Sequence, residues 1–318
     1  MRGVSDHDRP QVRYAFIEDS LKDPELAGIS IMRRCAVLDV SVSGFYDWRN
    51  RLQQDRPAAN SGAQSKVSDE TIIACVKKLR EDMGYTPGYR QLHAMLRDLN
   101  IKVDVKRLQR LLRTHGYIGY RHRRRYVKTT DSNHYMTVYP NLLQRNFEPG
   151  QVNRAWVTDI TYLATEQGFT YLTAFVDLGT RLVVGWAMNT TMTTEFVLKA
   201  FDMAVQLRQA QGYDLAGTIV HSDRGSQYCS KLFQSRLSEL NMRPSMSDVG
   251  QCWDNAPGES IWSSLKRETL MGKRKFRDHA DAYGHVERWI SNYNRRRPHS
   301  ALGMRSPMNY EAVLSTQT

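Results

Sequence analysis

Cysteines are few in this sequence, and they are scattered. The 318 residues include four of them, Cys35, Cys75, Cys229 and Cys252, and no two form a Cys-x-x-Cys pair. Disulfide frameworks and zinc sites both need cysteines at close or regular spacing. We therefore expect neither of them.

Long apolar runs are also lacking. No run approaches the ~20 apolar residues that cross a bilayer. The N-terminal sequence M-R-G-V-S-D-H-D has no apolar signal core. These absences predict a cytoplasmic protein without a membrane partner.

Acidic residues are outnumbered by basic ones. The sequence has 33 Asp and Glu residues against 45 Lys and Arg residues, which gives a formal net charge of +12 and a pI near 9.6. Lys and Arg side chains release the counterions condensed on phosphate, so this surplus favours a polyanionic partner such as DNA. Charge alone leaves open a protein associated with ribosomes or membrane surfaces.

The residues that are present divide the chain into segments. The length predicts about two domains. Residues 1–66 predict a small helical region, and its polar end, from Gln53 to Ser68, predicts a linker. Residues 129–150 look extended and basic, and they end at Pro149-Gly150, which predicts a second boundary.

Residues 67–128 have the pattern of a helical DNA-binding domain. Asp69 is predicted to cap the first helix, Asp104 to cap the third, and Gly116 to end the third. Two helices joined by a short turn, the second apolar on one side and basic on the other, match a helix-turn-helix. The basic side carries Lys106, Arg107, Arg110 and Arg113. The alternative is a plain helical hairpin whose charges are only solvated.

A basic cluster interleaved with tyrosines follows this domain. It contains Arg121, Arg123, Arg124 and Arg125. Such a cluster can follow phosphates and stack on exposed bases. The alternative is a flexible basic linker.

From residue 151 the pattern changes to mixed α/β. Strands are predicted at 155–163, 169–178 and 181–188, and the short glycine-containing connections between them predict an antiparallel meander. The elements predicted next are a helix at 194–211, a strand at 218–222, a helix at 230–241, a strand at 243–247 and a helix from Asp254.

Three carboxylates in this segment carry the chemistry that we predict. Asp159 lies in the middle of the first strand, Asp223 at the end of strand 218–222, and Glu259 in the first turns of the last helix. Two strand-borne aspartates and a helix-borne glutamate can hold two divalent cations about 3.5–4 Å apart and support in-line displacement at phosphorus. Lys266 lies seven residues after Glu259, on nearly the same helical face.

Each of these residues has an ordinary structural explanation when taken alone. Asp159 could be an exposed strand residue or part of a salt bridge, and Asp223 could cap a turn. Glu259 and Lys266 could form a solvated face of their helix. Further carboxylates that compete with the three are Asp177 and Asp254.

The sequence motifs around these residues, called words below, resemble those of the insertion sequence 3 family of bacterial transposases, specifically of their OrfB-type catalytic half. The matching words are W-V-T-D-I-T-Y-L, H-S-D-R-G-S-Q-Y, D-N-A-P-G-E-S-I-W-S-S-L-K-R-E and Y-N-R-R-R-P-H-S-A-L-G. Between Asp223 and Glu259 lie 35 residues, which resembles the D,D-35-E spacing of the retroviral-integrase superfamily. The words G-Y-R-Q-L-H-A-M-L-R and K-R-L-Q-R-L-L-R-T-H-G resemble the family's helix-turn-helix, so the resemblance runs from about residue 40 to the end.

This resemblance implies an α/β, ribonuclease H-like (retroviral integrase) catalytic core at 151–312, including a C-terminal helical extension. It implies metal-dependent DNA strand cleavage and strand transfer, with Asp159, Asp223 and Glu259 binding two Mg²⁺ (or Mn²⁺) ions.

The resemblance also implies residues that hold DNA. Lys266 and Arg267 would hold the transposon end. The tail word Arg295-Arg296-Arg297-Pro298-His299 would contact phosphate or be structural.

The partners that the resemblance implies are DNA, as terminal inverted repeats and as target, further copies of the chain, and an upstream OrfA-type product. The reaction would take place in the bacterial cytoplasm at the nucleoid. In this family the upstream product supplies a leucine zipper, and no sustained heptad occurs in this sequence.

Two other functions stay open at this point. One is a metal-dependent nuclease of the same fold, which hydrolyses DNA without joining it, and the other is a non-catalytic DNA-binding regulator. The lack of clustered zinc ligands disfavours a retroviral-type integrase.

Overall fold

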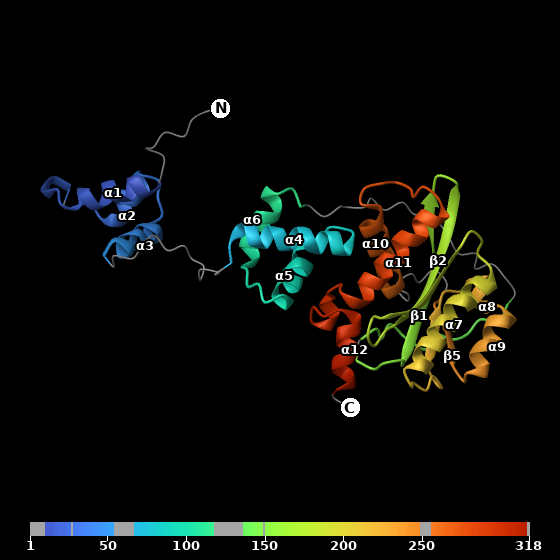
Figure 1. Cartoon of the computed structure of the whole chain (residues 1–318). Coiled ribbons are helices and arrows are strands. Elements are labelled where there is room, and N and C mark those ends of the chain that lie inside the picture. The colour runs from blue at the N-terminus through green and yellow to red at the C-terminus, as the bar shows by residue number, and fades with distance from the viewer. Residues whose placement is uncertain are drawn as a thin grey trace. The chain divides into compact units, whose positions relative to one another are not determined.

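The computed structural model describes residues 10–26, 28–53, 67–117, 136–148, 150–248 and 256–316 (Figure 1). The chain falls into two compact units, Met1–Lys66 and Val67–Thr318. The basic cluster at 121–125 and Asp254 lie outside the described residues. No helix in the described ranges is both long and apolar enough to span a membrane.

The described part of the first unit is a small helical bundle. Its elements are α1 (Pro10–Ser20), the 3-10 helix η2 (Pro24–Leu26), α2 (Ile31–Val37) and α3 (Val42–Gln53). The three α-helices contact one another around a core of Ile17, Cys35 and Phe45, each fully buried.

The second unit begins with α4 (Asp69–Met83), α5 (Tyr89–Asp98) and α6 (Val105–Thr114). Asp104 caps α6 as predicted, because its side chain accepts the N–H groups of Lys106 and Arg107. The predicted cap of α4 is wrong by one residue. The side chain of Ser68, not Asp69, accepts the N–H of Thr71, and it does so because Ser68 has the extended backbone that a cap requires.

A five-stranded sheet follows, in the order β3-β2-β1-β4-β5. The strands are β1 (Ala155–Thr165), β2 (Gly168–Asp177), β3 (Val183–Asn189), β4 (Ile219–Ser222) and β5 (Arg243–Met246). β1, β2 and β3 pair antiparallel, which confirms the predicted meander. β4 pairs parallel with β1, and β5 pairs parallel with β4.

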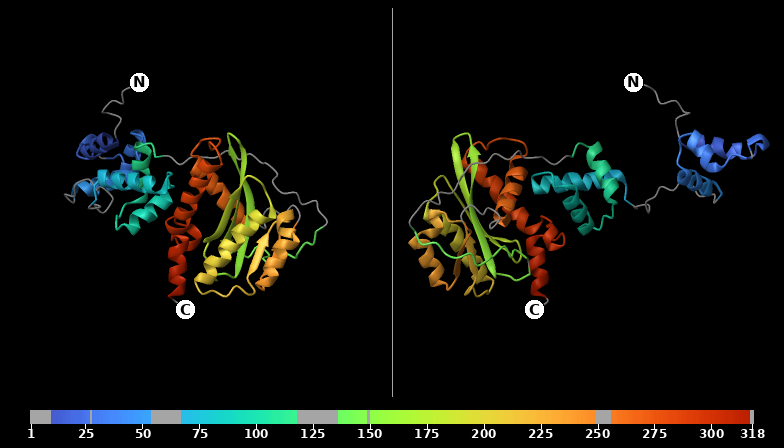
Figure 2. Two further views of the ribbon diagram at one scale, coloured as in Figure 1. Left: turned by 45° about the vertical axis from the view of Figure 1, so that its right-hand side comes forward. Right: turned by 180° about the vertical axis from the view of Figure 1, so that it is seen from behind.

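Helices cover both faces of this sheet (Figure 2). On one face lie α7 (Thr194–Ala210), α8 (Ser226–Cys229) and α9 (Lys231–Glu239), and on the other lie α10 (Ala256–Leu270) and α11 (His279–Arg295). Neighbouring strand residues point to opposite faces of the sheet. Trp156 therefore packs in the core beneath α7 and α9, and Val157 packs in the core beneath α10 and α11. The 3-10 helix η4 (Ser300–Leu302) and α12 (Pro307–Ser315) complete the unit, and α12 packs on α11.

The end of α4 is joined to α11 by side-chain hydrogen bonds. Asn292 donates its side-chain amide to the carbonyl oxygens of Asp82 (3.1 Å) and Met83 (3.2 Å). The side chain of Met83 is buried in the core that α10 and α11 share with the sheet. These contacts satisfy the last carbonyls of α4, which have no partner within their own helix.

Candidate active site

Asp159 lies on β1, opposite Ala174 of β2, and is half-buried. One of its carboxylate oxygens, Oδ1, accepts the backbone N–H of Ile160 at 2.8 Å. The other, Oδ2, accepts the indole N–H of Trp262 at 3.1 Å. The side chain is thus neither an exposed strand residue nor part of a salt bridge between described residues.

Asp223 follows β4 directly, and β4 pairs parallel with β1. The register pairs Val157 with His221, so Asp159 lies two residues beyond Val157 on β1, and Asp223 lies two residues beyond His221, just past the end of β4. Asp223 also accepts the N–H of Gly225 at 3.0 Å, which is the turn-capping role that was the alternative for this residue. The two roles are compatible because a carboxylate has about four acceptor positions.

Burial and the neighbouring carboxylates affect the ionisation of Asp159. The pKa of Asp159 is raised to about 8, first by burial and then by the negative charge of Asp223. The hydrogen bonds from Ile160 and Trp262 oppose this rise, and the charge of Glu259 adds to it. A buried carboxylate beside another carboxylate is costly unless a cation neutralises the pair.

Glu259 lies in the first turn of α10 and its side chain is exposed. It is close enough to Asp159 to raise the pKa of that residue. Within the described ranges, no three His, Cys, Asp or Glu side chains are grouped closely enough to hold a metal ion.

The residues around Asp159 nevertheless fit a divalent metal ion in their chemistry. Carboxylate oxygens are the ligands that Mg²⁺ prefers. Burial and the charges of Asp223 and Glu259 raise the pKa of Asp159, so ionising this carboxyl is costly in the protein alone. A divalent cation between Asp159 and Asp223 would remove that cost.

Lys266 lies on α10 near the acidic residues. Its Nζ atom sits over the ring of Tyr162, a β1 residue, at 4.3 Å from the ring centroid. Burial lowers the pKa of Lys266 to about 8, and the charge of Asp159 acts in the opposite direction. Its neighbour Arg267 is partly exposed and lies 3.3 Å from Glu268.

The predicted DNA-contacting face of α6 differs from residue to residue. Lys106, Arg110 and Arg113 are exposed, although Arg110 also pairs with Asp69 at 3.1 Å. Arg107 is half-buried, and its guanidinium group donates hydrogen bonds to the carboxylate of Asp69 and to the carbonyl oxygen of Val67, the latter at 3.0 Å.

Two residues that competed for a functional role are structural. Asp177 is fully buried and pairs with Arg208 at 2.8 Å, while it also accepts the N–H groups of Asn153 and Gly179. Arg297, in the tail word, is buried and pairs with Glu268 at 2.9 Å. The guanidinium groups of Arg208 and Arg297 therefore lie inside the protein and not on a surface that could face DNA.

Sequence reasoning missed the contribution of Trp262 to the site. The only signal in the sequence was its place in the word E-S-I-W, three residues after Glu259. His221, by contrast, matches the expectation of a satisfied histidine, because its two ring nitrogens lie 2.8 Å from Ser245 Oγ and 3.1 Å from Ser247 Oγ.

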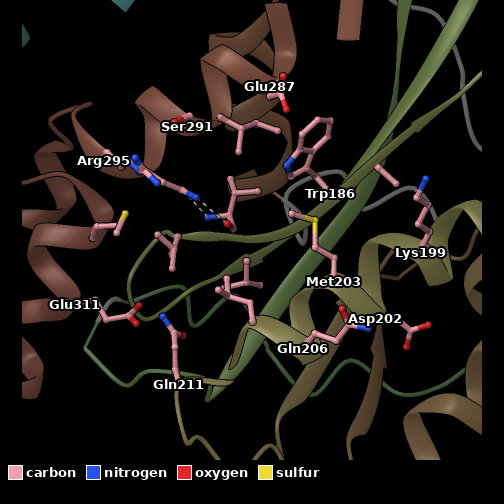
Figure 3. Close-up of a pocket in the computed structure, with 18 of the residues that line it drawn as sticks. Trp186, Lys199, Asp202, Met203, Gln206, Gln211, Glu287, Ser291, Arg295 and Glu311 are labelled. Atoms are coloured by element: carbon pink, nitrogen blue, oxygen red, sulfur yellow. Dashed lines mark hydrogen bonds between the residues drawn. The ribbon is translucent and has the colours of Figure 1, made fainter. Parts of the chain in front are cut away.

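A groove beside β3 is distinct from the acidic residues (Figure 3). It is lined by residues of β3, α7, α11 and α12, among them Trp186, Met203 and Arg295. Asn294 lies at this edge, where its side-chain amide pairs with both the N–H and the carbonyl of Val183. None of the three predicted catalytic carboxylates lines this groove.

Comparison with protein families agrees with this architecture. Residues 149–252 and 240–307 each match a family described as an integrase core domain, and residues 67–125 match an HTH-like domain. The class is therefore an integrase-type catalytic core with an HTH-like domain, and the predicted α/β ribonuclease H-like fold is confirmed.

Individual relatives narrow the class to a family. An insertion element IS600 31 kDa protein from Shigella sonnei is 38% identical, over 86% of this chain and 95% of the relative. Transposase InsF for insertion sequence IS3A from Escherichia coli K12 is 33% identical, over 94% of this chain and 98% of the relative. The chain belongs to the family of insertion sequence IS3 transposases.

Solved structures include viral integrases among the similar chains. The HTLV-2 integrase catalytic core domain in complex with magnesium is 15% identical with a TM-score of 0.39, over 51% of this chain and 97% of that one. A simian T-cell lymphotropic virus intasome chain is 13% identical with a TM-score of 0.46, over 73% of this chain and 70% of that one.

Proposed function

We propose that this DNA transposase cleaves and transfers DNA strands at a site formed by Asp159, Asp223 and Glu259, which together hold two Mg²⁺ (or Mn²⁺) ions. The observation that carries the proposal is that Asp159 and Asp223 each lie two residues beyond Val157 and His221, which are paired between the neighbouring parallel strands β1 and β4. Burial and then the charge of Asp223 raise the pKa of Asp159, so a cation would stabilise the ionised pair.

When bound, the two ions supply activation of the attacking oxygen and stabilisation of the leaving oxygen. The protein's own contribution is to fix the ligands. β1 holds Asp159 through its pairing with β2, Asp223 directly follows β4, and α10 brings Glu259 from a separate segment. Because water or a 3′-hydroxyl is the nucleophile in this scheme, no serine or tyrosine nucleophile is assigned.

Basic residues near the site and on α6 are proposed to bind DNA. Lys266 lies close enough to Asp159 for the charge of that residue to act on it, and it would hold the phosphate next to the scissile bond. Lys106, Arg110 and Arg113 would contact phosphates from the exposed face of α6. Arg267 and the basic cluster at 121–125 are assigned to the same role on sequence grounds.

The partners follow from the reaction. The DNA partners are the terminal inverted repeats of the element and its target, which places the reaction at the bacterial nucleoid. Joining two ends requires both to be held together, so we infer a homo-oligomer. An OrfA-type product is a further proposed partner, because the family resemblance assigns to it a leucine zipper, and this sequence has no sustained heptad.

The test uses the purified full chain with Mg²⁺ and labelled DNA that carries the inverted repeats of its source element. A Glu259→Gln variant serves as the control, since it removes one ligand charge with little change in size. Nicking and end-to-end joined product, absent in the control, support the proposal.

Other outcomes separate the alternatives. Nicking without joining favours either a nuclease or a transposase that needs the upstream partner. Adding that partner distinguishes the two, because joined product then appears only in the second case. DNA binding without chemistry, unchanged by Glu259→Gln, would contradict the proposal and leave a DNA-binding regulator.

A further inference from the structure

Trp262 joins the helix that bears Glu259 to the strand that bears Asp159. It lies on α10, three residues after Glu259, and is 5% exposed. Its indole N–H donates to Asp159 Oδ2 at 3.1 Å. An indole N–H can only donate, so this contact holds Asp159 as an acceptor.

The hydrogen bond completes the fixation of the Asp159 carboxylate. Oδ1 accepts the backbone N–H of Ile160 at 2.8 Å, and Oδ2 accepts the indole N–H of Trp262. With one donor on each oxygen, rotation of the carboxylate plane breaks at least one bond. Each oxygen keeps a further acceptor position for a cation.

The same contact fixes the position of α10 along β1. Residues three apart on a helix lie on one face, so Glu259 and Trp262 face the same side. Trp262 and Leu265 pack in the core shared by the sheet and α11, and Lys266 sits over Tyr162 one turn further on. Among these three α10 residues, Trp262 is the one that donates a hydrogen bond to the predicted metal ligand Asp159.

We propose that Trp262 is a positioning residue for the acidic site. It orients the Asp159 carboxylate and sets its separation from Glu259, so that the two act on the same metal ions. This inference rests on the proposed function of Asp159 as a metal ligand. Partners that orient a ligating carboxylate commonly change metal affinity by about 10–100-fold when they are removed.

Trp262 also fills space in the core, and the test has to separate packing from hydrogen bonding. Trp262→Phe keeps most of the apolar volume and removes the donor. Trp262→His keeps an aromatic N–H donor and removes more volume, so it creates the larger cavity. Packing and positioning therefore predict opposite orders for the two variants.

The experiment measures Mn²⁺ binding to the full chain without DNA by isothermal titration calorimetry at pH 8, with thermal unfolding of each variant in metal-free buffer. We expect Trp262→Phe to weaken Mn²⁺ affinity about 10–100-fold. Trp262→His should bind Mn²⁺ more tightly than Trp262→Phe although it unfolds at a lower temperature.

Asp159→Asn provides the reference for the underlying site. If Asp159→Asn weakens Mn²⁺ binding and Trp262→Phe does not, the positioning role is wrong and the proposed metal site stands. The positioning role is also wrong if affinity tracks the unfolding temperature, with Trp262→His the weaker binder. If Asp159→Asn binds Mn²⁺ like the wild type, both proposals fail.

Discussion

At the scale of single residues, the proposed acidic site brings Asp159 close enough to Asp223 for the two carboxylates to interact. The pKa of Asp159 is raised by burial and by the charge of Asp223, and two hydrogen bonds only partly offset this rise. The structural carboxylate of Asp177, by contrast, has a positively charged partner. Asp177 is buried against Arg208 and accepts two backbone N–H groups.

Replacing Asp223 with Asn tests the difference. We expect strand cleavage to fall at least about 1000-fold, equivalent to about 4 kcal/mol of lost transition-state stabilisation. Binding of the element-end DNA should be retained. Because the substitution removes the charge that repels Asp159, the unfolding temperature in EDTA should rise. Cleavage assays, DNA-binding titrations and thermal melts check the three outcomes, and retained cleavage would remove Asp223 from the catalytic set.

Lys266 gives a second prediction at this scale. Lys266→Ala should weaken binding of the element-end DNA about tenfold, or about 1.4 kcal/mol, while Mn²⁺ affinity changes little. Lys231→Ala, an exposed lysine on α9, makes the same charge change as a control. A loss of metal affinity as large as that of Glu259→Ala would contradict the assignment of Lys266 to DNA.

The contribution of Lys266 should also depend on pH. Burial lowers its pKa to about 8, so the free protein loses this positive charge as the pH rises through that value. The difference in DNA affinity between the wild type and Lys266→Ala should therefore shrink from pH 7 to pH 9. Fluorescence anisotropy titrations at fixed ionic strength measure it. A constant difference would show that the ammonium group is not what holds the DNA.

At the scale of single elements, α6 separates its charged residues into two groups. Arg107 donates to Asp69 and to the carbonyl of Val67, and so it fastens α6 to the start of α4. Lys106 and Arg113 are exposed on the helix surface. The predicted basic residues therefore do lie on the outer side of α6, but Arg107 is held by Asp69 and Val67 while Lys106 and Arg113 are exposed.

This difference predicts distinct effects of substitution. Lys106→Ala combined with Arg113→Ala should lower the slope of log affinity against log salt concentration by about 2, since each lost phosphate contact removes ~0.9. Arg107→Ala should reduce thermal stability by up to about 1 kcal/mol, because its partner is partly exposed. An unchanged salt slope in the double variant would mean that this face of α6 does not meet DNA.

At the scale of the whole second unit, a buried polar cluster connects α10 to α11 and the tail word. Glu268 of α10 accepts the indole N–H of Trp289 at 2.8 Å and pairs with Arg297 at 2.9 Å. Tyr85, in the turn after α4, is buried nearby, and burial and then the charge of Glu268 raise its pKa. The helix that carries Glu259 and Lys266 is thus fixed at its C-terminal end.

Removing the charge of Glu268 should destabilise this unit. Glu268→Gln leaves the buried guanidinium of Arg297 without its counter-charge, and such losses cost about 3–5 kcal/mol. Urea unfolding of the full chain measures this. Glu287→Gln, an exposed residue of α11, is the matched control and should change stability little. A loss below about 1 kcal/mol in Glu268→Gln would show that Arg297 finds another partner.

Much of this architecture could be predicted because its causes are local. The meander follows from the short connections at Gly168 and at Gly179-Thr180, and the cap of α6 follows from Asp104. Family membership could be predicted from words of eight or more residues in a fixed order. The cap of α4 shows the limit of local reasoning, since Ser68 and Asp69 are both suitable residues and backbone conformation chose between them.

The sequence by itself determined the order of the five strands and of α7, α9 and α10, the places of the three carboxylates along the chain and the family, because neighbouring residues and their spacing carry that information. Only the tertiary structure decided which distant groups meet. The indole of Trp262 lies 103 residues from Asp159, and Arg107 lies 38 residues from Asp69. Such contacts depend on how whole helices and strands pack, since the burial that brings these side chains together is a property of the assembled core and of no single segment.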